Sequence, residues 1–211
     1  SLNSSATSHG QLSADAMVRP LIGDGRLLAA ASGSWNDRFI DGNGDGFSDL
    51  PLTTRLSGFL KWSDGTVSAR RADLMARYWY EDRFGGVEAW TSADRGSSTI
   101  YGESITTRRW ELIGGFRPEP FGVPLRIDAA LSGHHQDSYY GATPYRAEQR
   151  TWFVQAAWAP RASEGEVRPL LGATWRRQWY DDNTPATAQP EDRIVPGVFG
   201  ELELPVGSRL T

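Results

Sequence analysis

The segment LRIDAALSGH, residues 125–134, decides the fold because its side chains alternate in character with a period of two. Every second residue is apolar, and the residues between are mostly polar. The apolar set is Leu125, Ile127, Ala129 and Leu131, and the intervening set is Arg126, Asp128, Ala130, Ser132 and His134. Successive side chains of a β-strand point to opposite faces of its sheet. The segment therefore predicts a strand with one apolar and one polar face.

The same alternation recurs along the chain, and no stretch shows helical periodicity. It predicts an all-β protein with nine long antiparallel strands. Their expected ranges are 10–20, 26–36, 51–63, 67–82, 104–117, 123–137, 147–160, 167–181 and 193–205. Several exceed the roughly 5–6 residues usual in soluble sheets. They match or exceed the roughly 9–11 residues that a tilted strand needs to cross a membrane.

The connections between these strands alternate in length. Short links, rich in Gly, Pro and Asp, are expected at 22–25, 63–65, 117–122 and 160–166. Long polar links are expected at 36–50, 83–103, 137–146 and 181–192. Short turns at one end and long loops at the other are typical of an up-and-down outer-membrane β-barrel. We therefore expect a segment of a transmembrane barrel, which would be an open curved sheet if it stood alone.

Composition excludes several classes of protein. The 211 residues contain no cysteine, which rules out disulfides, thiolate metal sites and a cysteine nucleophile. The net charge of -4 offers no electrostatic basis for binding nucleic acid. Nine tryptophans are a heavy aromatic load, and indoles favour membrane interfaces. Those near expected strand ends predict two aromatic girdles; they are Trp62 and Trp158 beside short links, and Trp35, Trp79 and Trp179 near long ones.

The acidic run DGNGDGFSD, residues 41–49, is the sharpest motif. Oxygen-bearing side chains at alternate positions, with glycines between them, suit a hard cation such as calcium. An EF-hand is excluded because its twelfth position would be Leu52 and strands flank the loop. The expected calcium ligands are Asp41, Asn43, Asp45, Asp49 and Glu88, with Glu81 or Asp82 as further candidates. The alternative is an Asx-rich turn whose side chains bond their own backbone.

No motif indicates an enzyme. His134 and His135 are adjacent on an expected strand, so they should point to opposite faces and cannot readily share one metal. Four carboxylates could be drawn into a paired-acid hydrolase site, but they share polar strand faces with four arginines. The carboxylates are Glu111, Asp128, Glu201 and Glu203, and the arginines are Arg55, Arg77, Arg109 and Arg126. This mixture is typical of a charged, water-filled barrel interior.

The stretch 41–90 resembles TonB-dependent outer-membrane receptors, particularly those of the cobalamin (vitamin B12) type. The residues that carry the resemblance are Asn43, Asp45, Gly46 and Phe47, then Tyr78, Tyr80, Glu81, Asp82 and Arg83. Further similar stretches are 101–102, 135–141, 145–149 and 194–197. The resemblance implies that Asp45 matches an acidic calcium ligand, that Asn43 stands where those receptors have Asp, and that Glu88 is a third ligand.

The resemblance implies that residues 1–211 are part of the barrel of a larger receptor, without its plug domain and remaining strands. The expected location is the bacterial outer membrane, and the expected partners are its lipid, a small nutrient such as cobalamin or an iron–siderophore, and TonB acting through the plug. Two alternatives stay open. The first is a passive porin-like barrel, and the second is a soluble glycan-binding β-protein.

Overall fold

A computed structural model describes residues 1–65, 72–160 and 166–204. These residues form a single all-β sheet of eleven antiparallel strands. The strands are β1 (Leu2–Ala6), β2 (Leu12–Val18), β3 (Leu21–Ile22), β4 (Gly25–Asn36), β5 (Leu52–Ser63), β6 (Ala72–Gly86), β7 (Gly102–Phe116), β8 (Leu125–Tyr140), β9 (Thr143–Trp158), β10 (Arg168–Asp182) and β11 (Glu191–Glu203). Two 3-10 turns, η1 (Ser92–Asp94) and η2 (Pro120–Gly122), lie in the connections. Within the described ranges, no helix has the length and apolar character that a membrane span requires.

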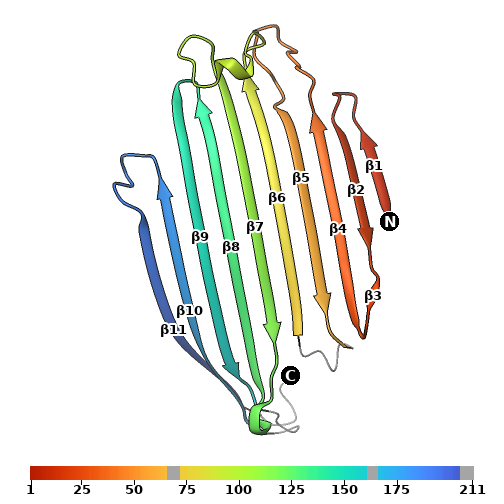
Figure 1. Ribbon diagram of the computed structural model, residues 1–211, viewed down its shortest axis with the longest axis vertical. Coiled ribbons are helices and arrows are strands. Elements are labelled where there is room, and N and C mark those ends of the chain that lie inside the picture. Colours follow the sequence, from red (N-terminus) through yellow and green to blue (C-terminus); the bar gives the residue numbers. More distant parts are fainter. Residues whose placement is uncertain (66–71, 161–165, 205–211) are drawn as a thin grey trace.

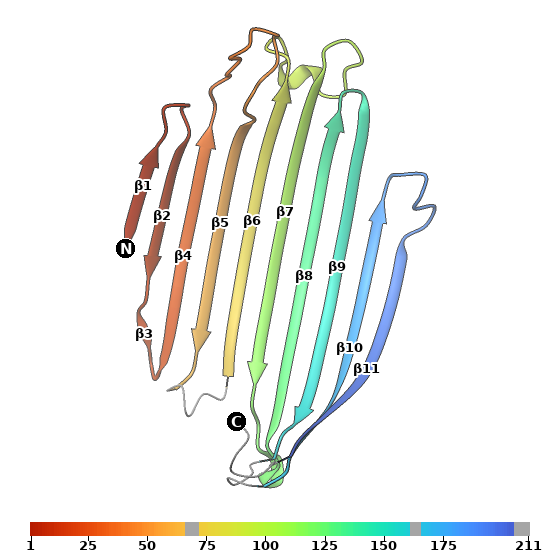
Figure 2. The ribbon, with the colours of Figure 1, turned by 180° about the vertical axis from the view of Figure 1, so that it is seen from behind.

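Strands that are neighbours in the chain are also neighbours in the sheet. The order runs from β1 through β2 and β4 to β11 without a crossover, and the short β3 pairs with the start of β4. The strands stand side by side in one layer, with the 37–51 and 87–101 connections at the same end (Figure 1). The view from behind shows no second layer against the other face (Figure 2). The expected all-β, up-and-down, open sheet is confirmed.

The sequence missed two of the eleven strands. Residues 2–6 have only Leu2 and Ala6 as apolar residues, yet β1 pairs along its whole length with β2. The Oγ atoms of Ser5 and Ser13, which face one another in this pair, lie 2.7 Å apart. Five residues with two apolar side chains are too short a segment for periodicity to give a signal, and backbone hydrogen bonding forms the strand. The two-residue β3 is too short to show any period.

The expected long link at 137–146 is wrong. The β8 and β9 strands continue past these limits and pair up to Tyr140 and Thr143. Only Gly141 and Ala142 form the turn, and Gly141 has a φ of +57° that glycine adopts without strain. The strands persist because polar side chains do not interrupt backbone pairing. The connections 37–51, 87–101 and 183–190 remain long, whereas residues 161–165 of the expected link at 160–166 lie outside the described residues.

The register between strands places the apolar side chains of neighbouring strands on one face of the sheet and most of the polar side chains on the other. We call one the apolar face; it carries Leu12, Ala14, Ala16 and Val18 of β2, Leu27, Ala29 and Ala31 of β4, Leu56, Leu60 and Trp62 of β5, Leu74, Ala76 and Tyr78 of β6, Trp110, Leu112 and Phe116 of β7, Ile127, Ala129 and Leu131 of β8, Trp152, Val154, Ala156 and Trp158 of β9, and Leu171, Ala173 and Trp175 of β10. We call the other the polar face; it carries Ser32, Arg55, Ser57, Lys61, Asp73, Arg77, Glu81, Thr107, Arg109, Glu111, Arg126, Asp128, Ser132, Thr151, Gln155, Thr174, Arg176 and Gln178. Because direct partners across every pair share a face, the sidedness extends over the whole sheet.

The sheet has almost no hydrophobic core of its own. Within the described residues, the only buried hydrophobic side chains are Ile105, Ala147 and Ala157. The chain exposes 14305 Å², whereas a compact monomer of its 23.3 kDa exposes about 9,700 Å². Much of the difference comes from the apolar face, where Leu60 is 50% and Trp110 46% exposed. The fold is thus held by backbone pairing, and one face lacks a protein layer against it.

Aromatic side chains form two slanting rows across the apolar face. The loop-side row is Trp35, Tyr78, Trp110, Trp152 and Trp175, and the turn-side row is Trp62, Phe116 and Trp158. Six residues, or about 20 Å, separate the rows along β9, from Trp152 to Trp158. The rows differ from the girdles that the sequence predicted. Trp79 lies on the polar face, under the guanidinium of Arg55 at 5.9 Å from the ring centroid.

Candidate functional site

The two longest connections lie against one another at the loop end of the sheet. Phe47 forms an isolated antiparallel bridge with Val87. The Ser48 N–H donates to the Gly86 carbonyl oxygen at 2.9 Å, and the Gly86 N–H donates to the Ser48 hydroxyl at 3.1 Å. The rings of Phe47 and Tyr101 are 6.4 Å apart. The acidic loop and the 87–101 connection are therefore one structural unit.

Asp41 organises the acidic loop through hydrogen bonds to backbone. Its carboxylate accepts from the N–H groups of Gly44 at 2.7 Å, Asp45 at 3.3 Å and Gly46 at 2.8 Å. Gly44 and Gly46 both have positive φ, which lets the chain turn tightly around the carboxylate. These bonds, led by that from Gly46, favour the charged form and hold the pKa of Asp41 below its usual range.

The other expected calcium ligands behave in the same way. Asp45 accepts from the Phe47 N–H at 2.9 Å and from the Asn43 side-chain amide at 3.0 Å. Asp49 accepts from the Gly42 N–H at 2.6 Å. Side chains that bond their own backbone are what the alternative interpretation, an Asx-rich turn, predicts. The four loop residues are thus gathered together, but mostly around backbone N–H groups.

The candidates from the neighbouring strand do not complete a cation site. Glu88 lies beside the loop, since its N–H donates to the Gly46 carbonyl oxygen at 3.0 Å. Glu81 pairs with Arg55 on the polar face, and Asp82 accepts from the Thr106 hydroxyl at 3.1 Å. The described residues contain no group of three or more acidic or His side chains placed to hold a metal ion. As arranged, the loop does not present a metal-binding group, and calcium binding stays a prediction.

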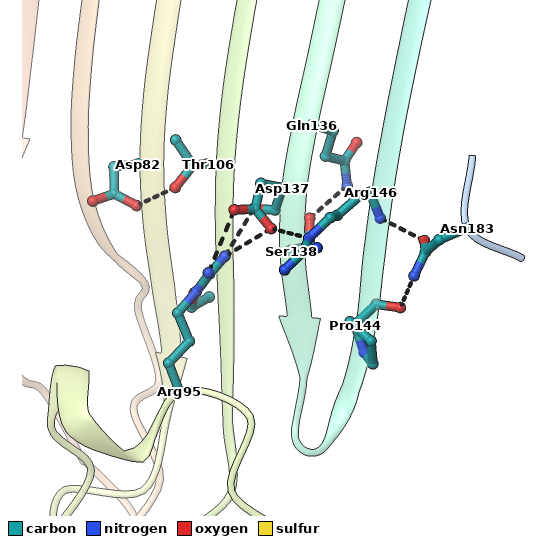
Figure 3. Close-up of polar contacts among 10 residues, drawn as sticks. Asp82, Arg95, Thr106, Gln136, Asp137, Ser138, Pro144, Arg146 and Asn183 are labelled. Atoms are coloured by element: carbon teal, nitrogen blue, oxygen red, sulfur yellow. Dashed lines mark hydrogen bonds and ion pairs between the residues drawn. The ribbon is translucent and has the colours of Figure 1, made fainter. Parts of the chain in front are cut away.

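An arginine-centred network ties the 87–101 connection to the sheet (Figure 3). The connection contains η1, closed by a reciprocal Thr91–Asp94 capping box. Beyond it, Arg95 Nη2 approaches Asp137 Oδ1 on β8 at 3.2 Å, and Arg95 Nε donates to the Ser104 hydroxyl at 2.7 Å. The guanidinium also lies 4.5 Å from the ring centroid of Tyr139. One side chain thus makes contacts on two strands.

The same network reaches the β10–β11 connection. Arg146 on β9 approaches the Asp137 carboxylate from the other side, at 3.4 Å (Figure 3). The Arg146 N–H donates to the Asn183 side-chain oxygen at 2.7 Å, and the Asn183 side-chain amide donates to the Pro144 carbonyl oxygen at 3.1 Å. Two long connections are therefore braced through one aspartate and the β8–β9 hairpin.

The polar face carries a ladder of ion pairs. Arg55 binds Glu81, whose side chain is 9% exposed, directly across the β5–β6 pair. On the next strands, Glu111 lies 2.6 Å from Arg109 and 3.8 Å from Arg77. Arg126 and Asp128 pair at 2.7 Å, and Arg168 and Glu203 at 3.6 Å. The ladder satisfies charges along a surface that remains open to water.

The sequence placed these charges correctly. The four carboxylates and four arginines that it assigned to polar strand faces share one face of the sheet. His134 and His135 pair with Gln149 and Glu148 respectively and point to opposite faces, as expected. The sequence did not single out Arg95, Arg146 or Asn183, because contacts between distant connections leave no periodic signal. Asp137 and Arg146 do lie in the stretches 135–141 and 145–149 that resemble TonB-dependent receptors, but the sequence assigns neither of them a contact.

The chain was compared with protein-family profiles and with curated proteins. No protein-family profile matches the chain, and no curated protein matches it significantly. The features that bear on function are therefore the apolar face, the polar face and the loop end of the sheet.

Proposed function

We propose that this chain forms part of the barrel wall of a TonB-dependent transport receptor in the bacterial outer membrane. Its ligand would be a small nutrient of the cobalamin or iron–siderophore type. The observation that carries the proposal is the sidedness of the sheet. One face is apolar between two aromatic rows, and the opposite face is a ladder of ion pairs.

Lipid is the cover that suits the apolar face. Leu60, Leu74 and Val154 are each more than 40% exposed on this face. Exposed apolar surface costs roughly 25 cal/mol per Å² in water, so a sheet of this size needs a partner layer. Strands with alternating apolar and polar faces, bordered by aromatic rows, meet the chemistry of a bilayer and its two interfaces. The roughly 20 Å between rows is on the short side of the usual apolar band of about 25 Å.

The polar face suits the water-filled interior of a barrel. Its charged side chains occur in both signs and pair across neighbouring strands, as Arg55 does with Glu81 and Arg77 with Glu111, or along one strand, as Arg109 does with Glu111. The long connections at one end would then form the entrance for ligand. Their bracing through Asp137 supports ordered loops at that entrance.

The TonB-dependent class rests on the sequence resemblance. Active transport would require the plug and the energy that TonB delivers through it. A passive porin-like barrel is the alternative, because an ion-paired, hydrated face serves a simple pore equally well. A soluble glycan-binding protein is disfavoured by the uncovered apolar face, which would drive aggregation in water.

The test uses the protein expressed from its complete gene in a Gram-negative host. The proposal predicts recovery in the outer-membrane fraction and accumulation of radiolabelled cobalamin or ferric siderophore that stops when tonB is deleted. A complemented tonB strain is the matched control. TonB-independent, size-limited entry of unrelated solutes would support the porin alternative. Recovery in the aqueous fraction would contradict both.

A further inference from the structure

The loop-side aromatic row carries a second pattern that the barrel proposal does not explain. On three strands, an arginine lies two residues beyond the tryptophan, on the same face and toward the loop end. The pairs are Trp110 with Arg108 on β7, Trp152 with Arg150 on β9, and Trp175 with Arg177 on β10. Because β7 and β9 run opposite to β10, the order in sequence is reversed while the order in space is kept.

An arginine is the first charged side chain beyond the aromatic row on each of these three strands. Carboxylates follow farther out, at Glu148 on β9 and Asp181 on β10. On the intervening β8, His135 stands level with Arg108, and Asp137 follows two residues beyond. On β9 a further arginine, Arg146, lies beyond Glu148, level with Asp137. The charge nearest the apolar band on β7, β9 and β10 is therefore cationic.

Two of the three arginines line a hollow at this level. A cavity of about 570 Å³ is lined by Arg108, by Arg150 with its partner Glu148, and by the rings of Tyr78, Trp110 and Trp152. The Trp110 ring lies against Gly133, where a Cβ would stand only 2.3 Å from the indole nitrogen.

Among the described residues, one of the three guanidinium groups lacks a partner. Arg150 pairs with Glu148 at 2.6 Å, and Arg177 pairs with Asp192 at 2.6 Å while lying 5.6 Å from the Trp152 ring centroid. Arg108 has no ion pair or hydrogen bond within the described part of the chain. The guanidinium of Arg108, in the wall of the cavity, is therefore available to an anion.

We infer that this tryptophan–arginine band binds the phosphate of anionic lipid headgroups in the leaflet on the loop side. The inference rests on the proposed membrane location. Indoles sit at the interface, long arginine side chains reach toward the headgroup plane, and guanidinium matches phosphate in geometry. The unpaired guanidinium of Arg108 in the wall of this cavity supplies the charge complementarity to phosphate.

The test uses the protein from its complete gene, purified in nonionic detergent, with dioleoylphosphatidylglycerol as the anionic probe and dioleoylphosphatidylcholine as the zwitterionic one. Native mass spectrometry measures the affinity for each lipid. R108Q/R177Q should weaken binding of phosphatidylglycerol about 25-fold, since each basic residue near an anionic surface contributes about fivefold. Phosphatidylcholine binding should not change.

The matched control is R109Q/R176Q, which removes the same charge from adjacent positions on the polar face; it should change neither affinity more than twofold. R108Q alone should weaken phosphatidylglycerol binding about fivefold, and it disturbs no contact that could unfold the chain. Equal losses in both double variants, or undiminished binding in R108Q and R108Q/R177Q, would overturn the inference while leaving the membrane location intact. A protein that needs no detergent would instead contradict the proposed function.

Discussion

The two faces of the sheet are built from the same strands, yet they differ in where charged side chains occur and in how those charges are paired. On the polar face, charges are neutralised by partners across the strand pair, as in Arg55 with Glu81, or two residues along the same strand, as in Arg126 with Asp128. On the apolar face, no charge occurs between the aromatic rows, and arginines appear only beyond the loop-side row. Since adjacent residues alternate between faces, a shift of one residue moves a side chain from one environment to the other.

The largest effect is expected from a charge placed inside the apolar band. Val154→Arg, between the two rows on β9, should destabilise the protein by about 2–4 kcal/mol in phosphatidylcholine vesicles, because a guanidinium at mid-bilayer is poorly solvated. Gln155→Arg, its neighbour on the polar face opposite Asp128, is the matched control and should be nearly neutral. Equilibrium unfolding in guanidinium chloride measures both. Equal stabilities would remove the distinction between the faces.

A smaller effect is expected from breaking the least exposed ion pair of the polar face. Arg55→Met leaves the carboxylate of Glu81, whose side chain is 9% exposed, without its cation and should cost about 1–3 kcal/mol. The cost is limited because the Arg55 side chain is itself half exposed. Arg193→Met, whose partner Glu191 is 44% exposed, should cost at most about 1 kcal/mol. The same unfolding assay measures both variants. Equal losses of stability in Arg55→Met and Arg193→Met would show that the pair of Arg55 and Glu81 contributes no more than an exposed ion pair.

In the loops, which lie beyond the two faces of the sheet, we expect the backbone to be held in place by hydrogen bonds from its N–H groups to side chains. Asp41→Ala removes the acceptor for three N–H groups, and amide exchange at Gly44, Asp45 and Gly46 should accelerate about tenfold. Asp37→Ala, in the same connection, is the control. Hydrogen exchange resolved by mass spectrometry tests this, and unchanged protection in Asp41→Ala would show that other contacts hold the loop.

Metal removal tests whether the acidic loop binds a cation in addition to forming its own hydrogen bonds. The hydrogen bonds to Asp41 need no cation, so protection of the loop amides should persist in EDTA. If the predicted calcium site exists, added calcium should raise protection further, and Asp45→Ala should abolish that rise. No change on adding calcium to the wild-type protein would dismiss calcium as a ligand.

The smallest effect concerns pH. The lowered pKa of Asp41 means that the folded loop favours the carboxylate, so its stabilisation is complete above the ordinary value of 3.8 and is lost as pH falls through the lowered pKa. Loop protection, corrected for intrinsic exchange, should therefore survive at pH 3.8 and decline below it. Asp41→Asn should show no such transition. A decline centred above 3.8 in the wild-type protein would contradict the proposed hydrogen bonding.

Much of the fold could be predicted because alternation is a local property. The stretch Leu125–Leu131 shows its two faces without reference to any other strand, and nine of the eleven strands were located this way. The missing β1 has only Leu2 and Ala6 as apolar residues, too few to show a period, and the hairpin at Gly141 lies within a polar stretch. Both depend on backbone pairing, to which side-chain pattern is indifferent.

The site was less predictable. The acidic loop stood out by composition, but whether its carboxylates would face a cation or the chain's own N–H groups depends on the path of the backbone between Asp41 and Asp49. The ion pairs of Asp137 with Arg95 and Arg146 join residues up to 42 positions apart, and no local sequence pattern predicts them.

The sequence by itself determined that the chain forms long two-faced strands, because the period of two is set by the geometry of a single strand. Only the tertiary structure decided which tryptophans share a row and that three arginines stand beyond it. Those features depend on the register between strands, which is set by pairing and turn geometry acting together across the sheet.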